Sequence, residues 1–309
     1  MSQPRIVFIV GPTAIGKSEA AVLLAERMGV EIVSCDSMQT YREINIASSK
    51  PPPSILKKVP HHLINVVSVE EPFDVAQYNR LANAAIKEIH KKGKVALVVG
   101  GSGLYMQVLL DGIFEGGPQD PDLRQKLENE IEKKGIEHLY ERLKNNDPEA
   151  AARIHVNNRR RIIRALEIYE SQRAPLTTLQ KTREGLWGKF DIHIFALTRP
   201  REELYGQINR RVDSMFKEGL VEEIKQIAGL RLSPTAQGLI GVKETMGFLK
   251  GQYDLDRAKY LMKLNTRHFA KRQLTWFRKD QRLKWILIEK DATLKSIAHN
   301  IENELKRKA

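Results

Sequence analysis

Continuous apolar runs that end at a small or acidic residue mark the expected β-strands of this chain. The expected strands are residues 5–10, 31–35, 94–99, 192–197 and 285–289. An unbroken apolar run is typical of a parallel strand that is buried on both faces. Between the runs, apolar residues recur at helical spacing. The expected helical segments are 17–28, a helix ending near 110, charged helices over 120–172, long helices over 201–279 and a helix after 289.

The order of these segments predicts an α/β fold. Strand, loop and helix alternate in the first 110 residues, which indicates a P-loop NTPase-like parallel sheet. After Gly116, Gly117 and Pro118 the pattern becomes helical and strongly charged before another strand begins. We therefore expect a catalytic core formed by 1–117 and 191–309, interrupted by a helical insertion domain at 118–190.

The bulk composition limits the class of protein. With 309 residues, 41% of them hydrophobic, the chain can bury a sizeable core. No apolar run approaches the ~20 residues that span a bilayer, and the N-terminal sequence lacks the layout of a signal peptide. Cys35 is the only cysteine, which excludes an internal disulfide and a multi-cysteine zinc site. We therefore expect a soluble cytoplasmic protein, with a monomer as the default.

The positive charge is placed unevenly. The net charge is +13, from 51 Lys and Arg against 38 Asp and Glu. The stretch 257–284 holds ten Lys or Arg and a single acid, Asp280. A second cluster consists of Arg159, Arg160, Arg161 and Arg164. Such clusters favour a polyanionic partner, and in particular a nucleic acid.

A phosphate-binding loop follows the first strand and opens the first helix. It fits G-x-x-x-x-G-K-[ST] with Gly11, Pro12, Thr13, Ala14, Ile15, Gly16, Lys17 and Ser18. The glycines let backbone amides close on phosphate oxygens, and the helix N-terminus adds a favourable dipole. Lys17 is expected to neutralise the terminal phosphate, and the Ser18 hydroxyl to hold Mg²⁺. We therefore predict binding of a nucleotide or another diphosphate.

An acidic residue that nucleoside triphosphatases place at a neighbouring strand end is missing here. The strand at 94–99 runs into Gly100 and Gly101 with no carboxylate. The nearest candidate is Asp36, after the second strand, which could serve as a metal ligand or as a base. This disfavours motor and GTPase functions and leaves room for an enzyme whose loop holds a diphosphate leaving group.

Motifs in family order along nearly the whole chain resemble those of the tRNA dimethylallyltransferases, also called tRNA isopentenyltransferases. The matching segments are GPTAIGKS (11–18), DSMQTY (36–41), SSKP (48–51), PHHL (60–63), VGGSGLY (99–105), RIHVNNRRRIIRALE (153–167), LIGVKE (239–244) and FAKRQLTWFR (269–278). Residues 47–49 are Ala-Ser-Ser where Gly-Thr-Ala is common, and Ser102 stands where Thr is common. No zinc-finger extension of the eukaryotic kind is present, which implies a bacterial-type enzyme.

The resemblance implies a reaction. The family transfers a dimethylallyl group from dimethylallyl diphosphate to N6 of adenosine 37, beside the anticodon of tRNA. An adenine amine is a poor nucleophile, so a carboxylate that accepts its proton would activate it. Asp36 is the candidate base, with a helix N-cap or a Mg²⁺ ligand as alternatives. By resemblance, Thr13 and Arg211 line the diphosphate site, and Mg²⁺ is the expected cofactor.

The resemblance also implies a tRNA-binding surface, because adenosine 37 must leave a stacked loop to reach a buried site. The expected contacts come from the segment after the second strand, the insertion and the last long helix. They are Asp36, Ser37, Met38, Gln39, Ser102, Arg124, Arg160, Arg161, Ile162, Ile163, Arg164, Gly241, Lys243, Lys271, Arg272, Gln273, Trp276 and Arg278. Phe277 is expected in the core, and a structural role is expected for His61 and His62.

Two rival functions stay open at this point. One is a small-molecule enzyme, either an adenylate isopentenyltransferase or a P-loop kinase, although a free nucleotide needs no basic track. The other is a non-catalytic RNA-binding protein that uses nucleotide as a switch. The missing acidic strand end and the presence of Asp36 disfavour that second alternative.

Overall fold

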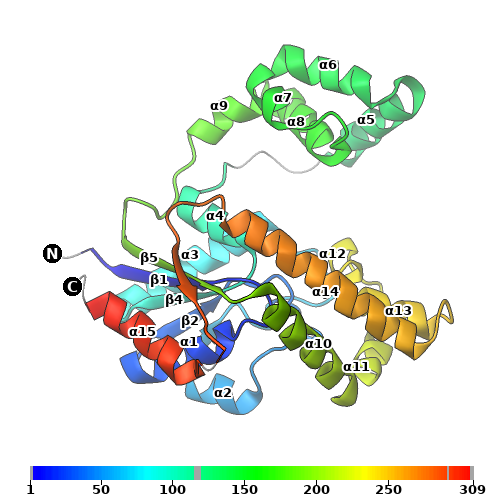
Figure 1. Ribbon diagram of the computed structural model, residues 1–309. Helices are drawn as coiled ribbons and strands as arrows, with labels where there is room; N and C mark the ends of the chain where they lie inside the picture. The colour runs from blue at the N-terminus through cyan, green and yellow to red at the C-terminus, as the bar shows by residue number, and fades with distance from the viewer. Residues whose placement is uncertain (1–2, 115–119, 291, 307–309) are drawn as a thin grey trace. The chain divides into compact units, whose positions relative to one another are not determined.

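A fully parallel sheet forms the centre of the computed structural model, which describes residues 3–114, 120–290 and 292–306 (Figure 1). Its six strands lie in the order β3-β2-β4-β1-β5-β6, and every neighbouring pair is parallel. They are β1 (Arg5–Val10), β2 (Glu31–Ser34), β3 (His61–His62), β4 (Ala96–Gly100), β5 (Asp191–Thr198) and β6 (Lys284–Leu287). The five predicted strands are therefore present with slightly shifted ends, while the two-residue β3 was not predicted.

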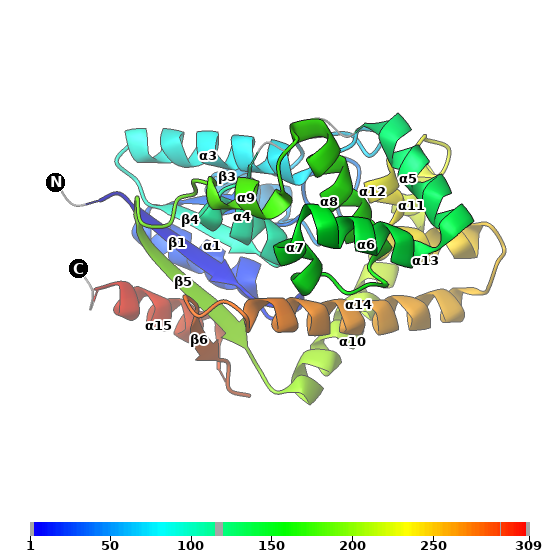
Figure 2. The ribbon, with the colours of Figure 1, turned by 90° about the horizontal axis from the view of Figure 1, so that it is seen from above.

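Helices cover both faces of this sheet. They are α1 (Lys17–Met28), α2 (Pro53–Lys58), α3 (Val75–Lys91), α4 (Gly103–Asp111), α10 (Arg201–Lys217), α11 (Leu220–Ile227), α12 (Pro234–Gln237), α13 (Val242–Leu249), α14 (Leu255–Phe277) and α15 (Leu294–Lys306). α1 and α15 pack together on one face, and α3 and α4 lie on the other (Figures 1 and 2). α10 and α13 both pack along α14, the longest helix among the described residues.

Burial of β1 on both faces explains its unbroken apolar sequence. Val7 and Ile9 join the core that α1, α10 and α15 build on one side. Ile6 and Phe8 alternate with them and are completely buried as well. Because successive side chains of a strand point to opposite faces, only an all-apolar run satisfies both layers.

The chain divides into two compact units. One comprises residues 1–110 and 186–309, and the other comprises 111–185. The predicted boundary at 117 and 118 lies outside the described residues. The second unit holds α5 (Pro121–Lys134), α6 (Ile136–Asn146), α7 (Pro148–Arg153), α8 (Arg159–Gln172) and α9 (Leu176–Lys181). It has its own core, which includes Leu127, Leu139, Leu143, Ile163 and Leu166.

None of the helices in 3–114, 120–290 and 292–306 is long and apolar enough to cross a membrane.

Candidate active site

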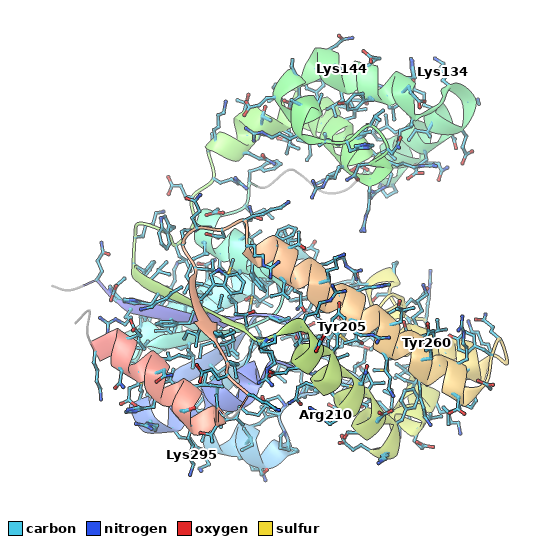
Figure 3. All side chains as sticks on the ribbon, in the orientation of Figure 1. Lys134, Lys144, Tyr205, Arg210, Tyr260 and Lys295 are labelled. Carbon is cyan, nitrogen blue, oxygen red and sulfur yellow. The ribbon has the colours of Figure 1, made fainter. Side chains whose placement is uncertain are left out.

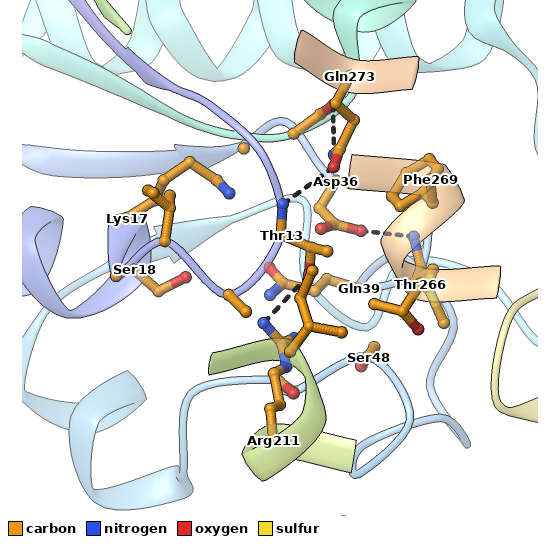
Figure 4. Close-up of a pocket in the computed structure, with 18 of the residues that line it drawn as sticks. Thr13, Lys17, Ser18, Asp36, Gln39, Ser48, Arg211, Thr266, Phe269 and Gln273 are labelled. Carbon is orange, nitrogen blue, oxygen red and sulfur yellow. Dashed lines mark hydrogen bonds between the residues drawn. The ribbon is translucent and has the colours of Figure 1, made fainter. Parts of the chain in front are cut away.

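The carboxyl ends of β1, β2 and β4 meet at one edge of the sheet, where a cavity of about 1010 Å³ opens. In parallel sheets, ligands bind at this edge, where the strand order reverses. The segments after all three strands line the cavity, and α10 and α14 supply further parts of its wall. Figure 4 shows side chains from these elements converging on one space.

The phosphate loop wraps around the start of α1. Gly16 sits at the N-cap with φ +94°, and no side chain caps this end of the helix. The left-handed conformation suits glycine, which has no Cβ to clash. The Nζ of Lys17 donates a hydrogen bond to the carbonyl oxygen of Pro12 at 2.7 Å, which folds this side chain over the loop. Unpaired amides at a helix N-terminus beside a cation form an anion-binding site.

Two cations and one carboxylate set the electrostatics of this loop. Burial lowers the pKa of Lys17 to about 8, although the nearby Asp36 opposes that shift and Arg211 adds to it. Burial also lowers the pKa of Arg211, again opposed by Asp36. The guanidinium of Arg211 donates to Thr13 Oγ1 at 3.2 Å, from α10 to the loop. Lys17, Arg211 and Thr13 therefore surround one position that suits a polyanion.

Asp36 follows β2 and faces the same cavity. Its Oδ1 accepts a hydrogen bond from the backbone N–H of Met38 at 2.8 Å, and residues 37–40 form a turn rather than a helix. The carboxylate therefore makes an Asx-turn, and the alternative of a helix N-cap is wrong. No described residue donates a hydrogen bond to Oδ2, so this oxygen is available to a ligand.

Gln273 of α14 ties two loops of the site together. Its Oε1 accepts from the backbone N–H of Thr13 at 2.9 Å, and its Nε2 donates to the carbonyl of Gly101 at 2.8 Å. The side chain is buried, and both bonds lie inside the cavity wall. Gln273 was predicted to contact tRNA, whereas its described polar contacts all join parts of this protein.

The glycines after β4 permit two close approaches. A Cβ on Gly100 would lie 2.0 Å from the carbonyl oxygen of Cys35, so β4 can pass the end of β2 only with glycine there. A Cβ on Gly103 would lie 2.3 Å from the ring of Trp276, which packs directly on the backbone at the start of α4. Burial raises the pKa of the Cys35 thiol to about 12, so this thiol is a packing group rather than a nucleophile.

The cavity brings together most of the predicted residues of the first unit. The predicted residues that line it are Thr13, Ala14, Ile15, Gly16, Lys17, Ser18, Asp36, Ser37, Met38, Gln39, Ser102, Arg211, Arg272, Gln273 and Trp276. Gly11 and Pro12 are buried behind the loop. Gly241, Lys243, Lys271 and Arg278 lie on α14 or near α13, outside the cavity lining.

The insertion corrects one part of the predicted tRNA surface. Ile162 and Ile163 are completely buried in the core of that unit, so their side chains cannot contact RNA. They lie between arginines in the sequence because α8 turns one face inward and another outward. Arg124 and Arg164 approach the buried Glu167 at 3.7 Å and 3.3 Å.

Arg160 and Arg161 differ from the other arginines of the insertion. Both side chains are exposed at the start of α8. No ion pair to either one occurs within the described part of the chain. These two charges are therefore free to meet a polyanion.

The basic residues of α14 fall into two groups. Lys263 pairs with Asp213 of α10 at 2.6 Å, and Arg267 lies 5.8 Å from the ring of Tyr205, labelled on α10 in Figure 3. These two hold α10 against α14. Lys271 and Arg272 are exposed instead and offer positive charge to a polyanion near the end of the helix.

Several cavity residues were not predicted from the sequence. Met262, Thr266 and Phe269 recur every three or four residues before Gln273 and Trp276 on α14, so they share one face of the helix. That stripe is a detectable signal, but it is indistinguishable from an ordinary core face. Others come from separate segments of the chain and include Ser48, His61, Arg199, Arg210 and Lys290.

A Mg²⁺ ion has two candidate protein ligands at this site, the Ser18 hydroxyl and the Asp36 carboxylate. The Ser18 hydroxyl lines the cavity beside Lys17 and is a hard oxygen ligand of the kind that Mg²⁺ takes. Across the described ranges, no group of three or more His, Cys, Asp or Glu could hold a metal ion. The residues fit a metal that is completed by phosphate oxygens and water, as is usual for Mg²⁺.

Comparison with known proteins assigns the site to a family. Residues 39–280 match the family model described as IPP transferase. A tRNA dimethylallyltransferase from Geobacter sulfurreducens is 43% identical over 287 residues, covering 92% of this chain and 92% of that protein. Another from Thermotoga maritima is 41% identical over 283 residues, covering 91% and 92%.

Solved structures agree with these sequence matches. The full-length tRNA isopentenylpyrophosphate transferase from Bacillus halodurans is 38% identical, with a TM-score of 0.71 over 99% of this chain and 98% of that chain. A eukaryotic dimethylallyltransferase acting on tRNA is 27% identical, with a TM-score of 0.84 over 99% of this chain and 80% of that chain. The chain belongs to the IPP transferase family.

Proposed function

We propose that this protein transfers a dimethylallyl group from dimethylallyl diphosphate to N6 of adenosine 37 in tRNA, which yields N6-isopentenyladenosine and diphosphate. One observation carries the proposal: a phosphate loop and the carboxylate of Asp36 line the same cavity. A diphosphate leaving group and a base are the two requirements of this transfer. The names of the bacterial relatives support the same reaction.

The diphosphate of the donor fits the cationic end of the cavity. Loop amides, Lys17 and Arg211 surround this end, and Thr13 is held between Arg211 and Gln273. The leaving diphosphate gains negative charge as its bond to carbon breaks. Fixed donors aimed at that charge stabilise the transition state more than the ground state.

Asp36 fits the role of general base. The Met38 amide holds one carboxylate oxygen, which orients the other toward the cavity. As N6 of the adenine forms its bond to C1 of the dimethylallyl group, the C1–O bond to diphosphate breaks and Asp36 accepts the N6 proton. Proton acceptance of this kind contributes about 10²- to 10⁴-fold in rate.

Mg²⁺ is the proposed cofactor, held by Ser18 together with the diphosphate oxygens. When bound, the metal neutralises charge on the diphosphate. The residues of the loop act beside it by binding and orienting the donor.

The tRNA would approach along exposed basic surfaces of both units. Lys271, Arg272 and Arg278 of α14 and Arg160 and Arg161 of α8 are exposed. Phosphate contacts from such residues position the RNA, while the target base is extruded into the cavity. We further propose that the protein works as a monomer in the cytoplasm and not at a membrane.

A donor and acceptor assay tests the proposal. The protein is incubated with labelled dimethylallyl diphosphate and Mg²⁺, together with tRNA, AMP or ATP. Label on tRNA is expected. Label on AMP would identify an adenylate isopentenyltransferase, and ATP turnover without label would identify a nucleotide-switched RNA-binding protein.

An isosteric variant tests the role of the base. Asp36→Asn should keep the affinity for tRNA and lose about 10²- to 10⁴-fold in turnover, because the amide cannot take the proton. Filter binding and single-turnover transfer measure the two quantities separately. Turnover equal to wild type would remove Asp36 as the base.

A further inference from the structure

Part of the cavity lining is apolar. The walls called the prenyl lobe below are Ala47, Met215, Ile240, Met262 and Phe269. In Figure 4, Phe269 lies with Thr266 and Ser48 on the side of the cavity away from Lys17 and Ser18. A donor whose diphosphate occupies the phosphate loop would therefore place its hydrocarbon chain toward this lobe.

Met262 and Ala47 of the prenyl lobe pack close to Gly241. A Cβ built on Gly241 would lie 3.1 Å from Met262 Cε and 3.3 Å from Ala47 Cβ. Both of these side chains are buried. An added methyl group at Gly241 would therefore force one of them to shift, which shows how tightly these two side chains are held.

Two buried carboxylates hold the backbone beside Ala47 and Gly241 in place. Glu223 accepts hydrogen bonds from the three consecutive amides of residues 45–47, at 2.8, 2.7 and 2.9 Å. Glu244 accepts from the amide of Gly241 at 2.7 Å and from Asn265 Nδ2 at 2.6 Å. Hydrogen bonds to charged acceptors are the strong ones, so the walls resist being pushed apart by a longer ligand.

The polar groups beside the prenyl lobe point their hydrogens away from it. Ser48 Oγ donates to the carbonyl of Ile44 at 2.7 Å, and Thr266 Oγ1 donates to the carbonyl of Met262 at 2.7 Å. Methionine, isoleucine and phenylalanine supply the remaining surface. The lobe therefore suits a short hydrocarbon and not a polar substituent.

We propose that Met262 and Ala47 set the length of the prenyl chain and restrict the donor to five carbons. The inference rests on the proposed function, because it assigns the hydrocarbon of the same donor to the prenyl lobe. A ten-carbon chain would need the space that Met262 Cε and Ala47 Cβ occupy. Shortening either side chain therefore opens the lobe to the longer donor.

A competition between two donors tests this inference. The holoenzyme with Mg²⁺ receives unmodified tRNA with dimethylallyl diphosphate or geranyl diphosphate, and mass spectrometry of the released nucleosides identifies the product. We expect wild type to prefer the five-carbon donor by about 100-fold or more in kcat/KM, since pockets discriminate roughly 10- to 200-fold per methylene group. Met262→Ala and Ala47→Gly should each reduce that ratio about 10-fold or more.

Matched variants distinguish an effect on the shape of the prenyl lobe from a loss of stability of the whole protein. Met106 is a buried methionine of α4 that does not line the cavity, so Met106→Ala should leave the donor ratio unchanged. Ala47→Val should raise the KM for the five-carbon donor without changing tRNA affinity. This variant keeps the test valid even where Met262→Ala does not fold.

Distinct outcomes overturn the two proposals. An unchanged donor ratio in Met262→Ala or Ala47→Gly, with five-carbon transfer retained, would overturn the assignment of chain length. An unchanged KM in Ala47→Val would do the same. Absence of any transfer to tRNA by wild type would instead refute the proposed function.

Discussion

Replacing Gln273 with leucine tests whether this residue bridges two loops of the site or contacts RNA. The substitution keeps the size of the side chain but removes the acceptor for the Thr13 amide and the donor for the Gly101 carbonyl, at 2.9 and 2.8 Å. An unpaired buried polar group costs about 1–3 kcal/mol, so two such groups should lower the free energy of unfolding by about 2–6 kcal/mol. For a unit of this size, that corresponds to a Tm lower by roughly 4–24 °C.

The same variant should impair donor binding more than tRNA binding. Thr13 Oγ1 accepts a hydrogen bond from Arg211. If the phosphate loop loses its anchor at Gln273, Thr13 moves and Arg211 loses this hydrogen bond. We expect the KM for dimethylallyl diphosphate to rise by about 10-fold, which corresponds to about 1.4 kcal/mol of lost donor interaction. The Kd for tRNA should stay at the wild-type value, because Gln273 is buried. Thermal unfolding, steady-state kinetics and filter binding measure the three quantities.

Two companion variants make the result decisive. Gln273→Glu keeps an oxygen acceptor for the Thr13 amide but places another oxygen against the Gly101 carbonyl, so it separates the two hydrogen bonds. Lys271→Ala alters an exposed residue of the same helix and should weaken tRNA binding without lowering Tm. Weaker tRNA binding by Gln273→Leu, with normal Tm and donor KM, would refute the bridging role.

Three further predictions follow from charged groups. Removing both Lys271 and Arg272 by alanine substitution should reduce the slope of log Kd for tRNA against log salt by about 1–2, and an unchanged slope would place them outside the interface. Burial opposes the charge of Glu31, but hydrogen bonds from one histidine and two lysines outweigh it and lower its pKa to about 2. Because the pKa of Glu31 is depressed in the folded state, the carboxylate adds at most about 3 kcal/mol to the free energy of unfolding. This contribution is present above pH 4.5 and is lost as pH falls toward 2. Glu31→Gln should therefore be less stable than wild type at pH 7 in urea unfolding, with the gap narrowing below pH 4.5; a gap independent of pH contradicts this. With the pKa of Lys17 lowered to about 8, kcat/KM for the donor should decline above pH 8. A flat profile to pH 9.5 would contradict a role for the charged ammonium.

Local sequence patterns predicted the features that depend on local structure. The unbroken apolar run of β1 and the phosphate loop after it were predicted because each is encoded by adjacent residues. Phe277 is fully buried, as predicted. In contrast, the roles of Gln273 and Met262 depend on segments more than 100 residues away. No periodicity in one helix identifies which distant loop it will meet.

Ile162 shows a different limit of predicting RNA contacts from the sequence. It lies inside a basic motif to which the family resemblance assigned contact with tRNA. In an α-helix, residues three or four apart share a face while adjacent residues are rotated by about 100°, and the structure places Ile162 in the core while Arg161 stays exposed. A motif therefore identifies the segment that binds, whereas helical phase decides which of its side chains can do so.

Two faces of α14 make different contacts, and this explains why the phosphate loop alone does not define the site. One face of the helix carries Gln273, which anchors the loop, and Met262, which lines the prenyl lobe. Another carries the exposed Lys271, positioned to meet a polyanion, and the exposed Arg272 beside it also reaches the cavity lining. A P-loop fold without this helix would keep its glycine turn but lose the anchor at Thr13 and the wall of the lobe. Selection of the donor and affinity for tRNA are therefore separable by mutation on a single helix, through residues that face inward or outward.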